Sequence, residues 1–197
     1  MFDSNFWKNK KVLITGHSGF KGSWLSLLLK SLGAKVYGIS LAPETKPALF
    51  DQIKLSDKIE FSFFIDINDK SNLNKKIIEI RPEIVFHLAA QPLVRQSYLN
   101  PIETWKTNLM GSLNLLESLT NLNSLCAVVM ITTDKVYKNR EWDYGYREND
   151  ELGGYDPYSA SKAACEIAIS SWRSSFCNAE YNKKEKLAIA SARAGNV

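Results

Sequence analysis

The sequence has few of the residue types that build disulfide frameworks and metal sites. Its 197 residues include three cysteines and two histidines. Cys126, Cys165 and Cys177 are too few and too scattered for a disulfide framework or a zinc site. With two histidines and no cluster of acidic residues, the sequence predicts no metal site.

Long apolar runs are also missing. No stretch reaches the about 18 apolar residues that a membrane-spanning helix needs. Residues 1–7 lack the basic and apolar regions of a secretory signal peptide. We therefore expect a cytoplasmic protein that does not bind a membrane.

Charge of one sign is not concentrated anywhere along the chain. The net charge is +4, and the densest basic group, residues 183–186, is interrupted by Glu185. A solvated loop explains this group better than a nucleic-acid surface, which needs basic residues gathered on one face. The sequence thus predicts no nucleic acid partner.

What the sequence does contain is an alternation of short apolar runs and amphipathic segments. Apolar runs predict strands over residues 11–15, 36–39, 61–65, 84–88, 127–131 and 187–192. Apolar residues spaced as on one helix face predict helices over residues 23–32, 71–80, 101–119 and 158–176. Gly33 is expected to end the first helix, and Asn100-Pro101 and Asp156-Pro157 to begin the last two. This order predicts an α/β fold with a doubly wound parallel sheet, whose ligands bind at the carboxyl ends of the strands.

Three glycines, Gly16, Gly19 and Gly22, lie between the first predicted strand and the first predicted helix. Glycine permits a tight turn and lets backbone amides approach a pyrophosphate at the positively polarised start of a helix. The spacing G-x-x-G-x-x-G in this context predicts dinucleotide binding and a Rossmann fold rather than an ordinary turn. His17, inside the loop, is expected to be an exposed turn residue.

The end of the second strand carries Ser40 where an acidic residue often holds the adenosine ribose of NAD. No arginine for a 2′-phosphate occupies the position either, so the sequence favours NAD over NADP. Asp66, which ends the third strand, is a candidate partner for the adenine amino group. The alternative for Asp66 is a helix-capping or turn aspartate. His87, at the end of the fourth strand, is expected to be packed in the interior.

Tyr158 and Lys162 lie four residues apart on the last predicted helix and therefore share a face. A nearby ammonium favours the phenolate and lowers the pKa of a tyrosine, so this pair can take a proton from a sugar hydroxyl. Thr133, Asp134 and Lys135 follow the fifth strand, and we expect them to face the same cavity as a hydroxyl and an acid/base couple. The alternative for this triplet is a polar turn with a surface salt bridge.

With these motifs, the chain resembles the CDP-glucose 4,6-dehydratases, a family of extended short-chain dehydrogenases/reductases. The resemblance runs from about residue 7 to residue 197 and is carried by five segments. They are TGHSGFKGSWL (15–25), HLAAQPLVR (87–95), NPIETW (100–105), TTDKVY (132–137) and GGYDPYSASKA (153–163). The glycine loop and the tyrosine–lysine pair occur throughout the extended short-chain dehydrogenases, whereas the sequences FKGSW and GGYDPY are more specific to this family.

The resemblance implies a lyase that converts CDP-glucose to CDP-4-dehydro-6-deoxyglucose and water, with NAD as a recycled hydride carrier. It implies that Tyr158, helped by Lys162, takes the proton of the 4-hydroxyl, which Thr133 holds. It further implies Asp134 as the acid for the leaving 6-hydroxyl and Lys135 as the base at carbon 5. Related dehydratases carry glutamate at the position of Lys135.

The motifs and the resemblance together give the expected ligand contacts. The expected NAD contacts are Gly16, Gly19, Phe20, Lys21, Gly22, Ser40, Asp66, Ile67, Leu88, Ala89, Ala90, Gln91, Asn108, Thr132, Tyr158 and Lys162. The implied substrate contacts are Gln91, Thr133 and Asn196.

The resemblance also implies properties of the whole protein. Residues 1–197 correspond to the NAD-binding domain, and family members continue into a smaller substrate domain, so we expect this chain alone to bind sugar nucleotide weakly. The helices over 101–119 and 158–176 resemble those through which the family forms homodimers. Trp105 and Trp172 belong either to that interface or to the core. The family supplies 6-deoxy sugars for bacterial surface polysaccharides, including lipopolysaccharide O-antigen.

Three alternatives stay open. A 4-epimerase would use Tyr158 and Lys162 and would not need an acid/base couple at residues 134 and 135. A dehydratase for UDP- or dTDP-sugars would share the whole motif set. A non-catalytic nucleotide-sensing module would keep the fold alone, and the intact Thr133, Tyr158 and Lys162 argue against it.

Overall fold

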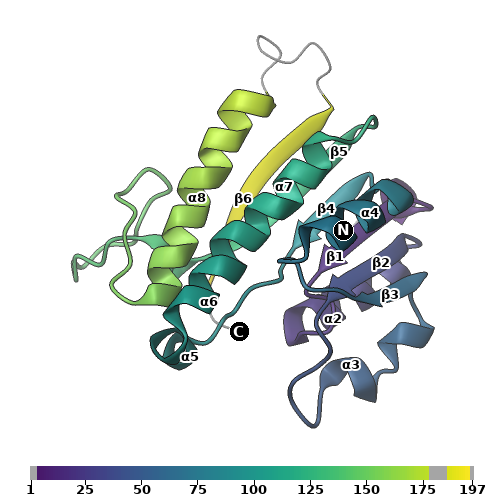
Figure 1. Cartoon of the computed structure of the whole chain (residues 1–197), viewed down its shortest axis with the longest axis horizontal. Coiled ribbons are helices and arrows are strands. Elements are labelled where there is room, and N and C mark those ends of the chain that lie inside the picture. The colour runs from purple at the N-terminus through teal and green to yellow at the C-terminus, as the bar shows by residue number, and fades with distance from the viewer. Residues whose placement is uncertain (1–3, 178–185, 196–197) are drawn as a thin grey trace.

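The computed structural model describes residues 4–177 and 186–195, which form a six-stranded parallel sheet (Figure 1). The strands run in the order β3-β2-β1-β4-β5-β6. They are β1 (Lys11–Thr15), β2 (Lys35–Ser40), β3 (Phe61–Phe64), β4 (Ile84–His87), β5 (Cys126–Thr133) and β6 (Leu187–Ala194). The order reverses between β1 and β4, so the predicted doubly wound Rossmann topology is confirmed.

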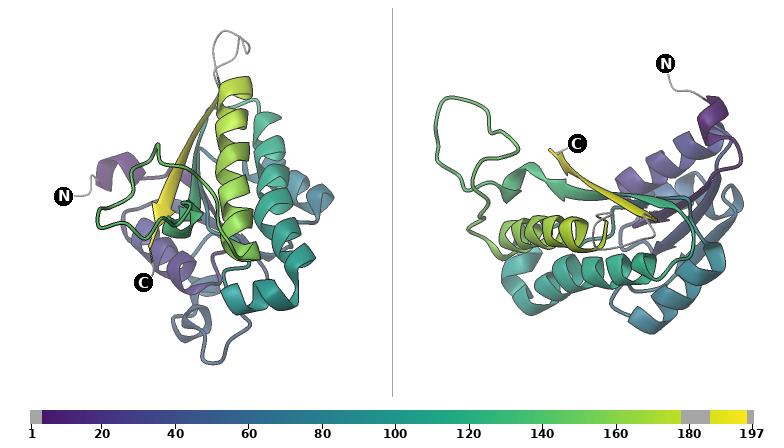
Figure 2. Two further views of the ribbon diagram at one scale, coloured as in Figure 1. Left: turned by 90° about the vertical axis from the view of Figure 1, so that its left-hand side faces the viewer. Right: turned by 90° about the horizontal axis from the view of Figure 1, so that it is seen from above.

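Helices cover both faces of the sheet, as the two views of Figure 2 show. One face is covered by α4 (Lys70–Ile80), α7 (Ser112–Thr120) and α8 (Pro157–Phe176), and the other by α2 (Phe20–Ser31), α3 (Leu49–Gln52) and η1 (Leu55–Asp57). Side chains alternate along each strand, so Leu13 enters the core under α4, α7 and α8, whereas Val12 and Ile14 enter the core under α2. Burial on both faces explains why the strands read as continuous apolar runs.

The helix predicted over residues 101–119 is divided. It consists of α6 (Pro101–Trp105), a π-helical turn η2 (Lys106–Gly111) and α7. Gly111 at the end of this turn lies against Ile67, where a Cβ would come within 2.6 Å of Ile67 Cδ1. A π-helical turn inserts an extra residue and often occurs at functional sites, and sequence periodicity gives no sign of it.

Helix starts were the less accurate part of the prediction. α2 begins at Phe20 instead of residue 23, because Gly22, a poor helix former, is kept inside the helix by close packing. Asn100 and Pro101 begin α6 as predicted, with Asn100 at the N-cap position, although its side chain makes no capping hydrogen bond. The cap at Asp156 is confirmed, since its carboxylate accepts from Ser159 N at 2.9 Å.

Two further short helices, α1 (Ser4–Trp7) and α5 (Val94–Leu99), and the 3-10 turn η3 (Asp134–Val136) were not predicted. Each is too short to show helical periodicity. Gly33 follows α2 with φ +88°, as expected for a helix-ending glycine. Within the described ranges, no helix is both long and apolar enough to span a membrane.

Candidate active site

The glycine loop is closely packed against the end of β4. A Cβ on Gly16, whose φ is +77°, would come within 2.7 Å of Ala89 N, and one on Gly22 would come within 2.1 Å of Gly16 O. Gly19 caps α2 without a side-chain hydrogen bond, so the amides of the first turn have no capping side chain. This arrangement of bare backbone at the start of a 12-residue helix fits a pyrophosphate.

His17 is buried, which corrects the expectation of an exposed turn residue. Its Nε2 lies 2.6 Å from Ser62 Oγ and its Nδ1 lies 3.0 Å from Ser40 Oγ. Burial lowers the pKa of His17 to about 4, against a weaker opposing effect of a hydrogen bond with the backbone of Ile39. The neutral ring therefore ties the glycine loop to the carboxyl end of β2 and to Ser62 in β3. An exposed position was expected because loop position alone suggests contact with solvent.

Ser40 and Asp66, the candidate contacts for the adenosine of NAD, both make hydrogen bonds within the protein. The hydroxyl of Ser40 meets the His17 ring. Asp66 Oδ1 accepts a hydrogen bond from Asn68 N at 2.8 Å, which matches the alternative of a turn aspartate. Ile67 is buried in the core beneath η2. Contacts of these three residues with NAD remain predictions.

The loop after β4 is held by a buried amide. Asn108 Oδ1, from the π-helical turn, accepts from Gln91 N at 2.8 Å, and its Nδ2 donates to Gln91 O at 3.2 Å and to Ser161 Oγ at 2.9 Å. The side chain of Gln91 closes the same loop, because its Nε2 donates to Thr104 Oγ1 at 2.9 Å. Leu88, Ala89 and Ala90 stay partly exposed at the strand end. These contacts join the β4 loop to α8.

His87 is packed in the interior, as predicted. Its Nδ1 lies 2.6 Å from Thr15 Oγ1 and its Nε2 lies 2.9 Å from Ser112 Oγ. Burial, with a smaller contribution from the positive charge of Lys162, lowers the pKa of His87 to about 3. A neutral imidazole therefore connects β1 to α7 behind the site.

Tyr158 and Lys162 both face the end of β5. Lys162 is buried, and its Nζ donates to the carbonyl of Ile131 at 2.9 Å. The phenol of Tyr158 lies within hydrogen-bonding reach of the Thr133 hydroxyl. Burial raises the pKa of Tyr158 and outweighs the hydrogen bond from Thr133, which favours the phenolate. The expected lowering of this pKa by Lys162 is therefore wrong for the protein alone, where burial also lowers the pKa of Lys162 itself.

The Thr-Asp-Lys triplet lies beside the tyrosine. Thr133 Oγ1 donates to Asp134 Oδ1 at 3.0 Å and accepts from Lys135 N at 3.3 Å. The Nζ of Lys135 lies 3.5 Å from Asp134 Oδ1. Tyr158, Thr133 and Asp134 are thus brought together as predicted, and the two charged side chains of the triplet are paired with each other.

Other predicted residues lie at the edge of this arrangement. Phe20 is 59% exposed at the start of α2. The Nζ of Lys21 donates to the carbonyl of Gly195 at 3.2 Å, which joins the glycine loop to the end of β6. Asn196 lies outside the described residues.

Two residues of the site were missed from the sequence. Glu166 is buried and accepts a short hydrogen bond from Thr132 Oγ1, and Arg193 Nη2 donates to Glu166 Oε2 at 3.2 Å. Thr132 was expected to contact NAD, but its hydroxyl is directed to Glu166. A signal was available, because Glu166 follows Lys162 by four residues and therefore shares its helix face.

Comparison with known proteins agrees with this geometry. The family model described as GDP-mannose 4,6 dehydratase matches residues 13–182. CDP-glucose 4,6-dehydratase of Salmonella typhimurium is 53% identical over 197 residues, which is 100% of this chain and 55% of the relative. CDP-paratose 2-epimerase of Salmonella typhi is 32% identical, over 79% of this chain and 51% of the relative.

Solved structures show the same fold. UDP-glucose 4-epimerase of Thermus thermophilus in complex with NAD superposes with a TM-score of 0.76 at 28% identity, covering 92% of this chain and 54% of that one. The chain spans about half the length of the relatives it matches. With the family model covering most of its residues, the chain belongs to the GDP-mannose 4,6 dehydratase family.

Proposed function

We propose that the protein is a CDP-glucose 4,6-dehydratase, a lyase that forms CDP-4-dehydro-6-deoxyglucose and water with NAD as its cofactor. The observation that carries the proposal is 53% identity to an enzyme of that name over the whole chain. The grouping of Tyr158, Thr133 and Asp134 at one strand end supports the same chemistry.

NAD fits the residues at the carboxyl edge of the sheet. The glycine loop and the uncapped start of α2 would hold the pyrophosphate. Tyr158 and Lys162 would lie on the nicotinamide side. When bound, NAD supplies an acceptor for the hydride of carbon 4 that can later return it to carbon 6. The solved epimerase from Thermus thermophilus, which shares the fold, was determined with NAD.

Tyr158 is the base for the 4-hydroxyl in this proposal. When the Thr133 hydroxyl turns from Asp134 Oδ1 to the phenol oxygen of Tyr158, it becomes a donor that favours the phenolate. Burial opposes the charged form, so the base needs further positive charge nearby, which Lys162 and the bound cofactor would supply. Because Thr133 lies beside Tyr158, its hydroxyl would hold the substrate 4-hydroxyl next to this base.

Asp134 and Lys135 carry the elimination in this proposal. Once carbon 4 is a ketone, the proton on carbon 5 becomes acidic and Lys135 removes it, while Asp134 protonates the leaving 6-hydroxyl. Transfer of a proton from the Lys135 ammonium to the Asp134 carboxylate, across the 3.5 Å between Nζ and Oδ1, would give the neutral amine and the carboxylic acid that this step needs. The elimination would then return Lys135 to the ammonium and Asp134 to the carboxylate.

We further propose that residues 1–197 form the NAD-binding domain of a cytoplasmic homodimer that serves O-antigen synthesis. Apolar side chains on the candidate dimer helices support an interface there: Ile102 is 79% exposed, Met110 51% and Ile167 61%. Trp172 instead packs on the core, and its Nε1 donates to Thr120 Oγ1 at 2.9 Å. These contacts support a structural role for Trp172 within one chain.

The test is to incubate the complete protein containing this chain with CDP-, UDP- and dTDP-glucose and NAD. The expected product is a 4-keto-6-deoxy sugar from CDP-glucose, detected by the ketone absorbance in alkali and by mass. A stereoisomer of unchanged mass would identify a 4-epimerase, and preference for another base would reassign the substrate. Calorimetry with residues 1–197 alone should show NAD binding and weak binding of CDP-glucose.

A further inference from the structure

One face of α8 holds three successive residues of β5. Tyr158, Lys162 and Glu166 are spaced four residues apart and so lie along one side of the helix. The Tyr158 phenol lies within hydrogen-bonding reach of the Thr133 hydroxyl, and Lys162 Nζ donates to the Ile131 carbonyl. Thr132 lies between Ile131 and Thr133 on β5, and its hydroxyl donates a short hydrogen bond to Glu166. The end of β5 is therefore fixed residue by residue, and the central contact belongs to a residue that the proposed mechanism does not use.

Glu166 is a buried, fully engaged carboxylate, with 6% of its surface exposed. Ser191 Oγ donates to its Oε2 at 3.1 Å and Arg193 Nη2 donates to the same oxygen at 3.2 Å. Burial alone would raise the pKa of Glu166, but the hydrogen bonds from Arg193, Thr132 and Ser191 lower it. The carboxylate therefore stays charged and joins α8, β5 and β6 at one point.

Arg193 extends this contact to the segment between β5 and α8, which projects beyond the sheet in Figure 2. Its Nη1 donates to the carbonyl of Glu148 at 3.0 Å, and its guanidinium lies 4.7 Å from the ring centre of Tyr137. Tyr137 stacks in turn on Tyr146, with ring centres 5.0 Å apart. The segment that separates Lys135 from Tyr158 is thereby anchored to Glu166 through Arg193.

Buried ion pairs add little net stability, because desolvation offsets their attraction. The Glu166–Arg193 pair is therefore better explained by the residue that it holds in place, Thr132. The residue that follows Thr132 is Thr133, which contacts both Tyr158 and Asp134. A shift of about 1 Å in catalytic geometry can cost about a hundredfold in rate, so the placement of Thr133 matters more than the energy of the pair.

We infer that Glu166, held by Arg193, is a positioning residue of the dehydratase: through Thr132 it sets where Thr133 meets Tyr158. The inference rests on the proposed function, since it assigns a role within that reaction. Two other charged groups raise the pKa of the Tyr158 phenol, namely Asp134 from η3 and Asp156 at the start of α8. Lys162 lies one helical turn along. Asp156, the N-cap of α8, and Lys162 make hydrogen bonds to residues other than Thr132, whereas Asp134 is hydrogen-bonded to Thr133 and would shift with it.

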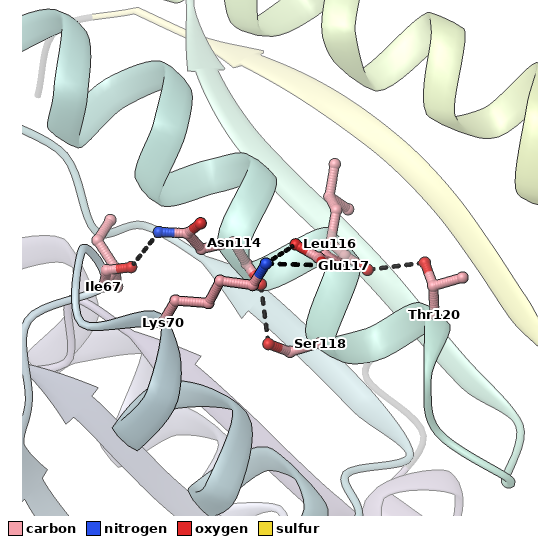
Figure 3. A network of polar contacts seen from close by, with 7 residues as sticks. All are labelled: Ile67, Lys70, Asn114, Leu116, Glu117, Ser118 and Thr120. Atoms are coloured by element: carbon pink, nitrogen blue, oxygen red, sulfur yellow. Dashed lines mark hydrogen bonds and ion pairs between the residues drawn. The ribbon is translucent and has the colours of Figure 1, made fainter.

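The experiment compares Thr132→Val and Glu166→Gln in the complete protein. Thr132→Val removes the hydroxyl that reaches Glu166 and leaves the Glu166–Arg193 pair intact, so it folds even where Glu166→Gln leaves Arg193 unpaired. Glu117→Gln is the matched control, because Glu117 pairs with Lys70 between α7 and α4, as Figure 3 shows, with 45% of its side chain exposed. The measurements are kcat and KM for CDP-glucose against pH, NAD affinity and thermal unfolding.

Thr132→Val should lower kcat about tenfold or more with KM nearly unchanged, as expected for a misplaced reacting group. The acidic limb of the kcat profile should move to higher pH, because a weaker hydrogen bond from Thr133 raises the pKa of Tyr158. Glu166→Gln should move both quantities the same way, and Glu117→Gln should move neither.

A Thr132→Val enzyme with an unmoved acidic limb would overturn the inference alone, even if kcat or stability fell, since that pattern belongs to a purely structural residue. If the wild-type protein turns over no CDP-glucose, the proposed function fails and the inference falls with it. The wild-type assay therefore distinguishes the two failures.

Discussion

The backbone of Gly38 lies directly against the imidazole ring of His17. A Cβ built at residue 38 would come within 2.3 Å of both Cγ and Cδ2 of the ring. The ring is buried and engaged with hydroxyls of β2 and β3, so it has no room to withdraw. The glycine in β2 is therefore the complement of the histidine in the cofactor loop, and the two residues form one packing unit.

Gly38→Ala should consequently destabilise the protein and weaken NAD binding together. Overpacking a filled core costs about 1–3 kcal/mol, and displacement of His17 moves the glycine loop. Urea unfolding and NAD calorimetry measure the two effects. Gly145→Ala is the control, because no atom lies within 4 Å of a Cβ at residue 145. Equal stability of the two variants would show that the imidazole can shift at no cost.

The two histidines should make stability fall in weakly acidic solution. Burial lowers the pKa of His17 to about 4 and of His87 to about 3, whereas both bind a proton near pH 6.5 in the unfolded chain. Between the folded and the unfolded pKa values, the unfolded state binds more protons than the folded state. The contribution of the two histidines to the free energy of unfolding is therefore fully present above about pH 6.5 and is lost as the pH falls towards about 4. The slope should be about 1.4 kcal/mol per pH unit for each ring.

Urea unfolding between pH 7.5 and 5 checks this slope. Replacing His17 with glutamine should remove one of the two protons and reduce the slope between pH 6 and 5 by roughly half. A slope that is the same in both proteins would mean that His17 is exposed enough to protonate in the native state.

Most of the fold could be predicted, because strands buried on both faces and helices buried on one leave direct periodicities in the sequence. Gly16, Gly22, Tyr158 and Lys162 could be located because their chemistry requires fixed spacings. His17 and Glu166 could not be assigned with the same rules. Their roles depend on Ser62 and Arg193, which are far along the chain and meet them only once the sheet is assembled.

The pKa of Tyr158 illustrates a different limit. Spacing correctly placed Lys162 on the same helix face, but the ammonium is directed to the carbonyl of Ile131. Burial, which spacing does not reveal, then decides the direction of the shift. A sequence motif specifies which groups are present, whereas their protonation depends on solvent access and on every polar group nearby.

Tyr158→Phe should abolish turnover and leave NAD binding intact. A positioned general base contributes about 10²–10⁴ in rate, and phenylalanine keeps the ring while removing the hydroxyl that meets Thr133. Product formation from CDP-glucose and NAD calorimetry give the two readouts. Tyr155→Phe, at a residue that is 82% exposed, is the matched control. Retention of turnover in Tyr158→Phe would reassign the base to another residue.

Asn108→Ala should disconnect the β4 loop from α8. The buried amide makes three hydrogen bonds, to the backbone of Gln91 on both sides and to Ser161 Oγ. Its removal leaves the Gln91 amide without its side-chain acceptor, which costs about 1–3 kcal/mol. Because Gln91 closes the strand end beside the glycine loop, NAD affinity should fall as well. Asn121→Ala, an exposed change at the end of α7, serves as the control for asparagine removal. Unfolding midpoints and NAD calorimetry for the pair decide the matter: an Asn108→Ala protein that loses stability but binds NAD as before would show that the π-helical turn supports the core and not the cofactor site.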